Sequence, residues 1–185
     1  MQVPNAMTSD AELPSIGRFS RAMEVVLTIV LALIPVALAL FAFLFSEQLA
    51  RSTALTGINA VSEPLSLTWS LVAFLVLLAA SAPLMYAANA ARLMFAGFYR
   101  GEVFTPLTAT RIKQIALGLL AQAFVTPLAG LALSWVLRSA GKADGLALSI
   151  TSSDLWVAVF AFIFLGIARV MRAAALLAED NAAIV

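Results

Sequence analysis

The chain has 185 residues, of which 63% are hydrophobic and only 11% charged, and its mean hydropathy is +1.02. Soluble domains are about half apolar and about a quarter charged, so an excess this large requires lipid as a second solvent. The formal net charge of +1 gives no reason to expect direct nucleic-acid binding. Because the chain contains no Cys and no His, thiolate chemistry is excluded and the commonest metal ligand and general base are missing, and no catalytic, cofactor or metal site is predicted.

Residues 1–20 are of mixed polarity and contain Pro4, Pro14 and Gly17, a pattern typical of a disordered tail. A cleaved signal peptide is not expected, because the apolar run behind this tail is about twice as long as the apolar region of a signal. Residues 21–185 then form the predicted membrane domain.

Four apolar runs follow, over 25–45, 67–91, 115–137 and 155–168. The first three are near or above the roughly 20 residues that cross a bilayer as a helix. The fourth has only 14 residues before Arg169, so it crosses only if Arg169 reaches toward the headgroups or the bilayer thins. We therefore predict an all-α, integral membrane four-helix bundle with spans near 23–45, 67–91, 115–137 and 155–172.

Charged and aromatic residues predict the orientation of these spans. Basic residues favour the cytoplasmic side, and eight of them lie on the side that carries both ends of the chain, against three on the other. Both termini are thus expected in the cytoplasm, with the protein in a plasma (inner) membrane. Trp69, Trp135 and Trp156 all fall at the opposite boundary, where indoles favour the interface. On that side, the alternation over Leu146–Thr151 predicts a short extended stretch on the membrane surface.

The last apolar run leads into a charged segment. On a helix, four of its residues fall within one stripe about 100° wide: Arg169, Arg172, Glu179 and Asp180. Because the opposite side is rich in alanine, we predict that the fourth helix continues to about Asn181 as an amphipathic cytoplasmic extension. Arg169 and Arg172 are interpreted as anchors at the inner boundary, where they reach lipid phosphates, with an ion pair to Glu24 as the alternative.

Polar residues within the runs have structural and functional interpretations. Gln122 and Thr126 lie one turn apart in the third run, and an interhelical hydrogen bond, worth ~0.5–2 kcal/mol, is favoured over substrate binding. The spacing of Ala87 and Ala91 allows close helix approach. Each of the first three runs has one proline near its middle, which is expected to kink the helix. We favour kinks that improve packing over kinks that open a polar cavity. The three residues are Pro35, Pro83 and Pro127.

Glu24 is the one acidic residue near the start of a membrane run on the inner side. Small four-helix multidrug exporters use a glutamate buried in the middle of the first span. Glu24 instead lies at the membrane boundary, three residues after Arg21, where it complements the positive end of its own helix. A structural role is therefore favoured.

The loop between the second and third runs carries the most local signals. Gly101 suits a helix end, and Thr105 followed by Pro106 is typical of an N-cap with proline at the first helical position. Phe104 precedes the cap and is expected to pack onto the new helix near Ala109.

This loop resembles the DUF2975 family of bacterial membrane proteins of unknown function. Thr108 stands where the family usually has Asn, and Ala116 where it has Gly. The closing segment from Leu177 to Val185 is also similar to the family's end, and the resemblance covers all four spans in order. It implies a four-helix membrane protein, often encoded beside a small helix-turn-helix regulator, and no known activity. The matching loop residues are Gly101, Glu102, Phe104, Thr105, Ile112 and Ile115.

The leading functional hypothesis is a non-enzymatic multi-pass protein with a regulatory or sensory role and a cytoplasmic partner. The family resemblance suggests that this partner is a helix-turn-helix regulator. The alternative is a small transporter or exporter subunit, which a water-filled cavity in mid-membrane facing Gln122 and Thr126 would favour. An intramembrane enzyme ranks third, because no nucleophile and base are paired. The lipid bilayer is the expected surrounding, and the sequence leaves open whether the chain forms a homo-oligomer.

Overall fold

The computed structural model describes residues 9–44, 65–101, 105–143, 145–146 and 148–182. It confirms an all-α fold, with no β-strand in these residues. The helices are α1 (Ser9–Leu44), α3 (Leu67–Tyr99), α4 (Pro106–Ser139) and α5 (Ser152–Ala182). Each is long and apolar enough to cross a membrane, over stretches of 28, 33, 34 and 26 residues respectively.

The turn between α3 and α4 follows the local chemistry of its residues. Gly101, just after α3, has a φ of +82°, a left-handed conformation that residues with a Cβ rarely adopt. Thr105 caps α4, because its hydroxyl oxygen accepts a hydrogen bond of 3.2 Å from the amide of Thr108. Pro106 occupies the first turn, where no amide is needed. These expectations are confirmed, whereas Phe104 lies outside the described residues.

The start of α5 is fixed by a reciprocal cap. Asp154 is buried, and its Oδ2 accepts hydrogen bonds of 2.8 Å from both the amide and the hydroxyl of Thr151. The amide of Asp154 in turn donates to the carbonyl of Thr151 at 3.1 Å. The bond from the Thr151 amide to the Asp154 carboxylate is one half of a capping box, for which the Thr-x-x-Asp spacing is typical. From this cap α5 runs through Arg169 without interruption and ends at Ala182.

The first helix begins earlier than the composition indicates. We expected a disordered tail over residues 1–20, but α1 already begins at Ser9. The segment starts Ser-Asp-Ala-Glu, which is a helix-start pattern. Pro14 falls within the first two turns, so the one internal hydrogen bond that it removes lies close to the end of the helix.

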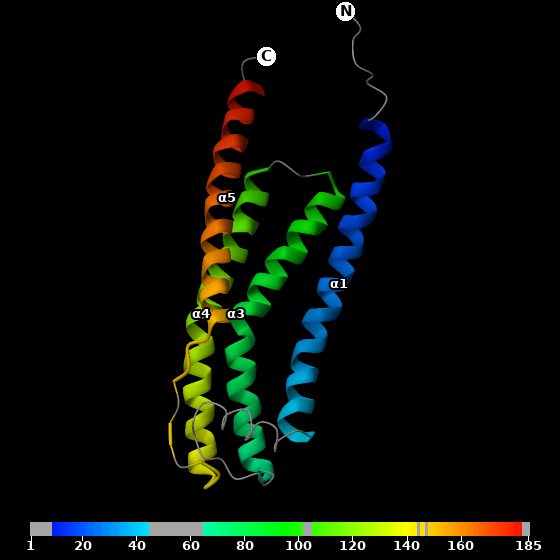
Figure 1. Cartoon of the computed structure of the whole chain (residues 1–185). Helices are drawn as coiled ribbons and strands as arrows, with labels where there is room; N and C mark the ends of the chain where they lie inside the picture. The colour runs from blue at the N-terminus through cyan, green and yellow to red at the C-terminus, as the bar shows by residue number, and fades with distance from the viewer. Residues whose placement is uncertain (1–8, 45–64, 102–104, 144, 147, 183–185) are drawn as a thin grey trace, which may run out of the picture.

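The helices pack in chain order, as a row. The extensive contacts join α1 to α3, α3 to α4, and α4 to α5. In Figure 1 the start of α1, the end of α5 and the turn between α3 and α4 lie at one end of the molecule, which we call the terminal end. The other end carries Trp69 and Trp135, and we call it the tryptophan end. Trp156 does not share this end, contrary to expectation, because α5 begins beside the middle of α4, where Asp154 and Ala123 line one pocket (Figure 1). The expected bundle is therefore open, with α1 and α5 at its two edges.

Small residues spaced seven apart hold α5 against α4. On α4, Ala109 and Ala116 are buried and Ala123 is half-buried. Ala109 and Ala168 line one pocket, while Ala123 and Asp154 line another, which sets an antiparallel register. Such spacing keeps one stripe of a helix facing its neighbour, and small side chains let two backbones approach closely. The buried positions on α5 are Asp154, Ala161, Ala168 and Ala175.

α3 and α4 approach most closely near their middles. A Cβ at Gly118 would lie 2.8 Å from the Cβ of Ala87 and 2.8 Å from the carbonyl oxygen of Pro83. The expected close approach at Ala87 is thus confirmed, with Gly118 as its partner. Figure 1 shows α3 bending near its middle, in the region of Pro83, so that its second half runs toward α1. This bend is the kink expected of an internal proline.

Larger side chains fill the tryptophan end. Val136 and Leu137 of α4 form its buried centre with Leu65, Ala73 and Ala143. Trp69 packs against this cluster, whereas Trp135 and Trp156 are exposed. Phe41 near the end of α1 also contacts the cluster, so three helices are fastened together here.

Candidate functional site

A groove of about 300 Å³ lies between the middles of α3 and α4. It is mainly apolar, and three polar side chains line it: Ser81 from α3, and Gln122 and Thr126 from α4. The sequence singled out Gln122 and Thr126, and the structure brings them together in one hollow. The transport alternative requires a water-filled cavity facing these two residues, whereas this groove is mainly apolar.

The polar atoms of this groove are already hydrogen-bonded within the protein. Oε1 of Gln122 accepts a bond of 3.2 Å from the amide of Leu84, directly after Pro83, and Nε2 donates at 3.1 Å to the hydroxyl of Thr126. That hydroxyl donates to the carbonyl of Gln122, and the hydroxyl of Ser81 donates to the carbonyl of Leu78. Gln122 therefore joins α3 to α4 at the proline kink, as the packing interpretation expects.

A second groove, of about 470 Å³, lies between α1 and α3 near the terminal end and contains Glu24. The guanidinium of Arg21 lies over the ring of Tyr99, 5.6 Å from its centre, in a cation–π contact. Glu24 forms no ion pair with Arg169 or Arg172, and that alternative is wrong. The reason is the row of helices, since α1 and α5 lie at its opposite edges and each packs mainly on its inner neighbour.

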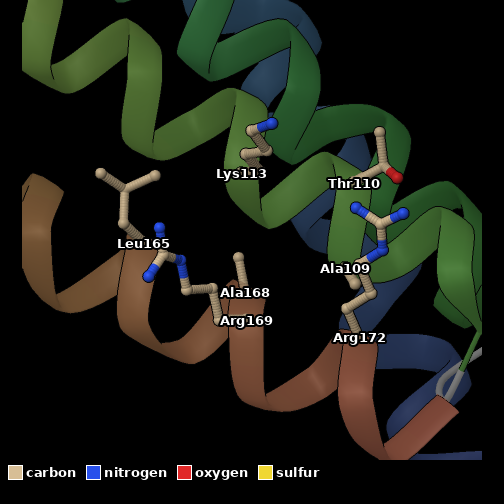
Figure 2. Close-up of a pocket in the computed structure, with 7 residues that line it drawn as sticks. All are labelled: Ala109, Thr110, Lys113, Leu165, Ala168, Arg169 and Arg172. Carbon is tan, nitrogen blue, oxygen red and sulfur yellow. The ribbon is translucent and has the colours of Figure 1, made fainter. Parts of the chain in front are cut away.

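A third hollow, of about 300 Å³, lies between α4 and α5 near the terminal end. Arg169 and Arg172 extend into it from α5, and Lys113 and Thr110 border it from α4 (Figure 2). Its wall is completed by Leu165 and by the buried alanines Ala109 and Ala168. The sequence singled out both arginines but not Lys113, because its place beside them depends on the register of α4 against α5.

An apolar hollow of about 400 Å³ lies between α4 and α5 toward the tryptophan end. Leu148 and Ile150, from the stretch expected to be extended, line it together with Phe124 and Leu155. Residues 148–150 have no regular secondary structure. Among the described residues that line it, Asp154 is the only charged one, and it is engaged in the cap of α5.

No group of three or more acidic, His or Cys side chains comes together among the described residues. The three polar side chains of the groove between α3 and α4 bond to backbone or to each other, and neither of the two hydroxyls there lies beside a base as a nucleophile would. Sequence reasoning missed Gly118, Lys113 and the Thr151–Asp154 cap. The cap had a recognisable spacing, whereas the other two depend on which helices face one another. Arg92 of α3 was also not singled out, although its Nε is buried without a hydrogen-bond partner among the described residues.

The fold defines a class of protein, a four-helix α-protein whose helices are suited to crossing a membrane. No protein-family model matches the chain, and comparison with curated proteins and with solved structures gives no match either. The resemblance to DUF2975 therefore stays a prediction.

Proposed function

We propose that this chain is a non-enzymatic, multi-pass protein of a bacterial plasma membrane, with a regulatory or sensory role carried out at its terminal end. In this proposal both termini and the α3–α4 turn lie in the cytoplasm, and the last turns of α5 extend beyond the bilayer. The role as a regulator agrees with the resemblance to DUF2975 and with its neighbouring helix-turn-helix proteins, one of which is the proposed partner.

One contrast carries the proposal. In the middle of α3 and α4, the polar side chain of Gln122 is paired with the hydroxyl of Thr126 and with the backbone amide of Leu84. At the terminal end, Lys113, Arg169 and Arg172 surround a pocket without a partner among the described residues. The cationic side chains that are available to bind a ligand or partner therefore lie at the end that the positive-inside rule assigns to the cytoplasm.

Site-specific photocrosslinking in cells tests this role. A photoreactive residue replacing Leu107 or Ala173, both exposed at the terminal end, should capture a soluble cytoplasmic protein. The matched control replaces Ser139, exposed at the tryptophan end, and should not capture it. The proposed cytoplasmic partner is ruled out if the terminal-end positions and the control position capture the same products. It is also ruled out if the terminal-end positions capture only lipid and other copies of the chain.

The second candidate, a small transporter or exporter subunit, is favoured by the groove beside Gln122. A transport path must admit water at this depth, whereas a packing groove is filled by lipid tails. Because the chain has no native Cys, the variant Ser81→Cys gives a clean test. Reaction with a charged, water-soluble thiol reagent at a rate near that of Ser139→Cys, which is exposed at the end of α4, would favour transport. Protection of Ser81→Cys is the result expected of a regulator.

A further inference from the structure

Among the residues whose side chains the structure describes, three cations and no anion line the α4–α5 pocket. The cations are Lys113, Arg169 and Arg172. Within the described part of the chain, none of the three forms a hydrogen bond or an ion pair. Other basic residues of the terminal end are engaged: Arg111 donates a bond of 2.9 Å to Gln114, and Arg21 stacks on Tyr99.

The three side chains are exposed at the pocket, so water screens much of the repulsion between them. An anion with several acceptor oxygens would replace that water and bind to all three positive groups. Guanidinium groups bind phosphate oxygens through two parallel hydrogen bonds, and an ammonium adds a mobile donor. The pocket volume of about 300 Å³ is well above the ~30 Å³ that one water occupies, so a phosphate and its neighbouring atoms fit.

The surroundings of the pocket indicate where such a phosphate comes from. Leu165 lines the pocket one turn before Arg169. Phe162, seven residues before Arg169 and on the same face of α5, is exposed, as is Leu117 one turn beyond Lys113 on α4. An exposed apolar strip therefore leads from the cations along the membrane-spanning part of both helices. A phospholipid has this pattern, with its phosphate at one end and its acyl chains at the other.

We propose that the α4–α5 pocket binds a phosphate group, and that in the membrane this group is the headgroup of an anionic phospholipid. Basic pockets between membrane helices on the cytoplasmic side bind such headgroups. The inference rests on this pocket alone and holds for either of the two proposed functions. A soluble phosphate offers the same chemistry without the acyl chains, and the experiment separates the two sources.

The test uses the full chain, purified in an uncharged detergent and titrated with phosphatidylglycerol while native mass spectrometry counts bound lipid. The variant Arg169→Gln/Arg172→Gln should weaken binding by at least about tenfold, since each arginine supplies charge-assisted hydrogen bonds. The control Arg18→Gln/Arg111→Gln removes the same charge from exposed or self-paired residues and should change binding by less than about twofold. Phosphatidylcholine and inorganic phosphate are titrated in parallel.

A lipid headgroup is supported if the pocket variant selectively loses binding of phosphatidylglycerol and the unaltered protein binds little phosphatidylcholine or inorganic phosphate. Tight binding of inorganic phosphate, lost in the same variant, supports the phosphate site but refutes the lipid source. Equal loss of phosphatidylglycerol binding in both double variants shows a general charge effect and overturns the site. Unchanged binding in the pocket variant also overturns it. If circular dichroism shows that the double arginine variant is not folded, Lys113→Gln replaces it in the same binding comparison.

Discussion

Gly118 sets the distance between α3 and α4. Its missing side chain leaves room for the Ala87 methyl and the Pro83 carbonyl, each of which a Cβ would approach to 2.8 Å. The Pro83 carbonyl belongs to the backbone and cannot rotate away, so any larger residue must push the helices apart. The same crossing carries the hydrogen bond from the Leu84 amide to Gln122, so a shift here also loosens that bond.

We therefore expect Gly118→Ala to lower the free energy of unfolding by about 1–3 kcal/mol, as overpacking does in other cores. Unfolding in mixed detergent–SDS micelles, followed by tryptophan fluorescence, measures the change. Gly130→Ala is the matched control on the same helix, because a Cβ there meets no atom within 4 Å. A Gly118→Ala variant as stable as Gly130→Ala would show that the close approach of α3 and α4 is not present.

Helix ends in this chain could be predicted from sequence because their chemistry is local. Gly101, Thr105 and Pro106 mark the α3–α4 turn with their own backbone preferences, and the structure has the turn there. The choice of neighbours could not be predicted in the same way. The alanines that hold α5 to α4 are a few among many in an alanine-rich sequence, and their spacing acquires meaning only once the two helices are known to pair. Lys113 was missed for the same reason.

The alanine stripe between α4 and α5 gives a second prediction. Ala161 is fully buried, with 0% of its surface exposed, so Ala161→Leu should force α5 away from α4 and lower stability by about 1–3 kcal/mol. Ala173→Leu makes the same change in size at an exposed position of α5 and should have little effect. Unfolding in mixed micelles compares the two. Equal stability of both variants would contradict close packing along this stripe.

Across the whole molecule, the row of helices separates two kinds of surface. The tryptophan end is fastened by a cluster that includes Val136, Leu137 and Phe41, whereas the terminal end contains the cation-lined pocket between α4 and α5. Most large apolar side chains of α1 are exposed, as suits a helix at the edge of a row in lipid. The molecule thus presents an apolar perimeter, one closely packed end and one end with free cations.

This arrangement predicts which residues share a side of the membrane, and the Cys-free sequence allows single cysteines to measure it. Arg18→Cys, Leu107→Cys and Ala173→Cys report on the terminal end, and Ser139→Cys reports on the tryptophan end; all four positions are exposed. With a membrane-impermeant maleimide, Ser139→Cys should react in intact spheroplasts. The other three should react only after permeabilisation. Labelling of Arg18→Cys and Ala173→Cys from opposite sides would contradict four membrane crossings.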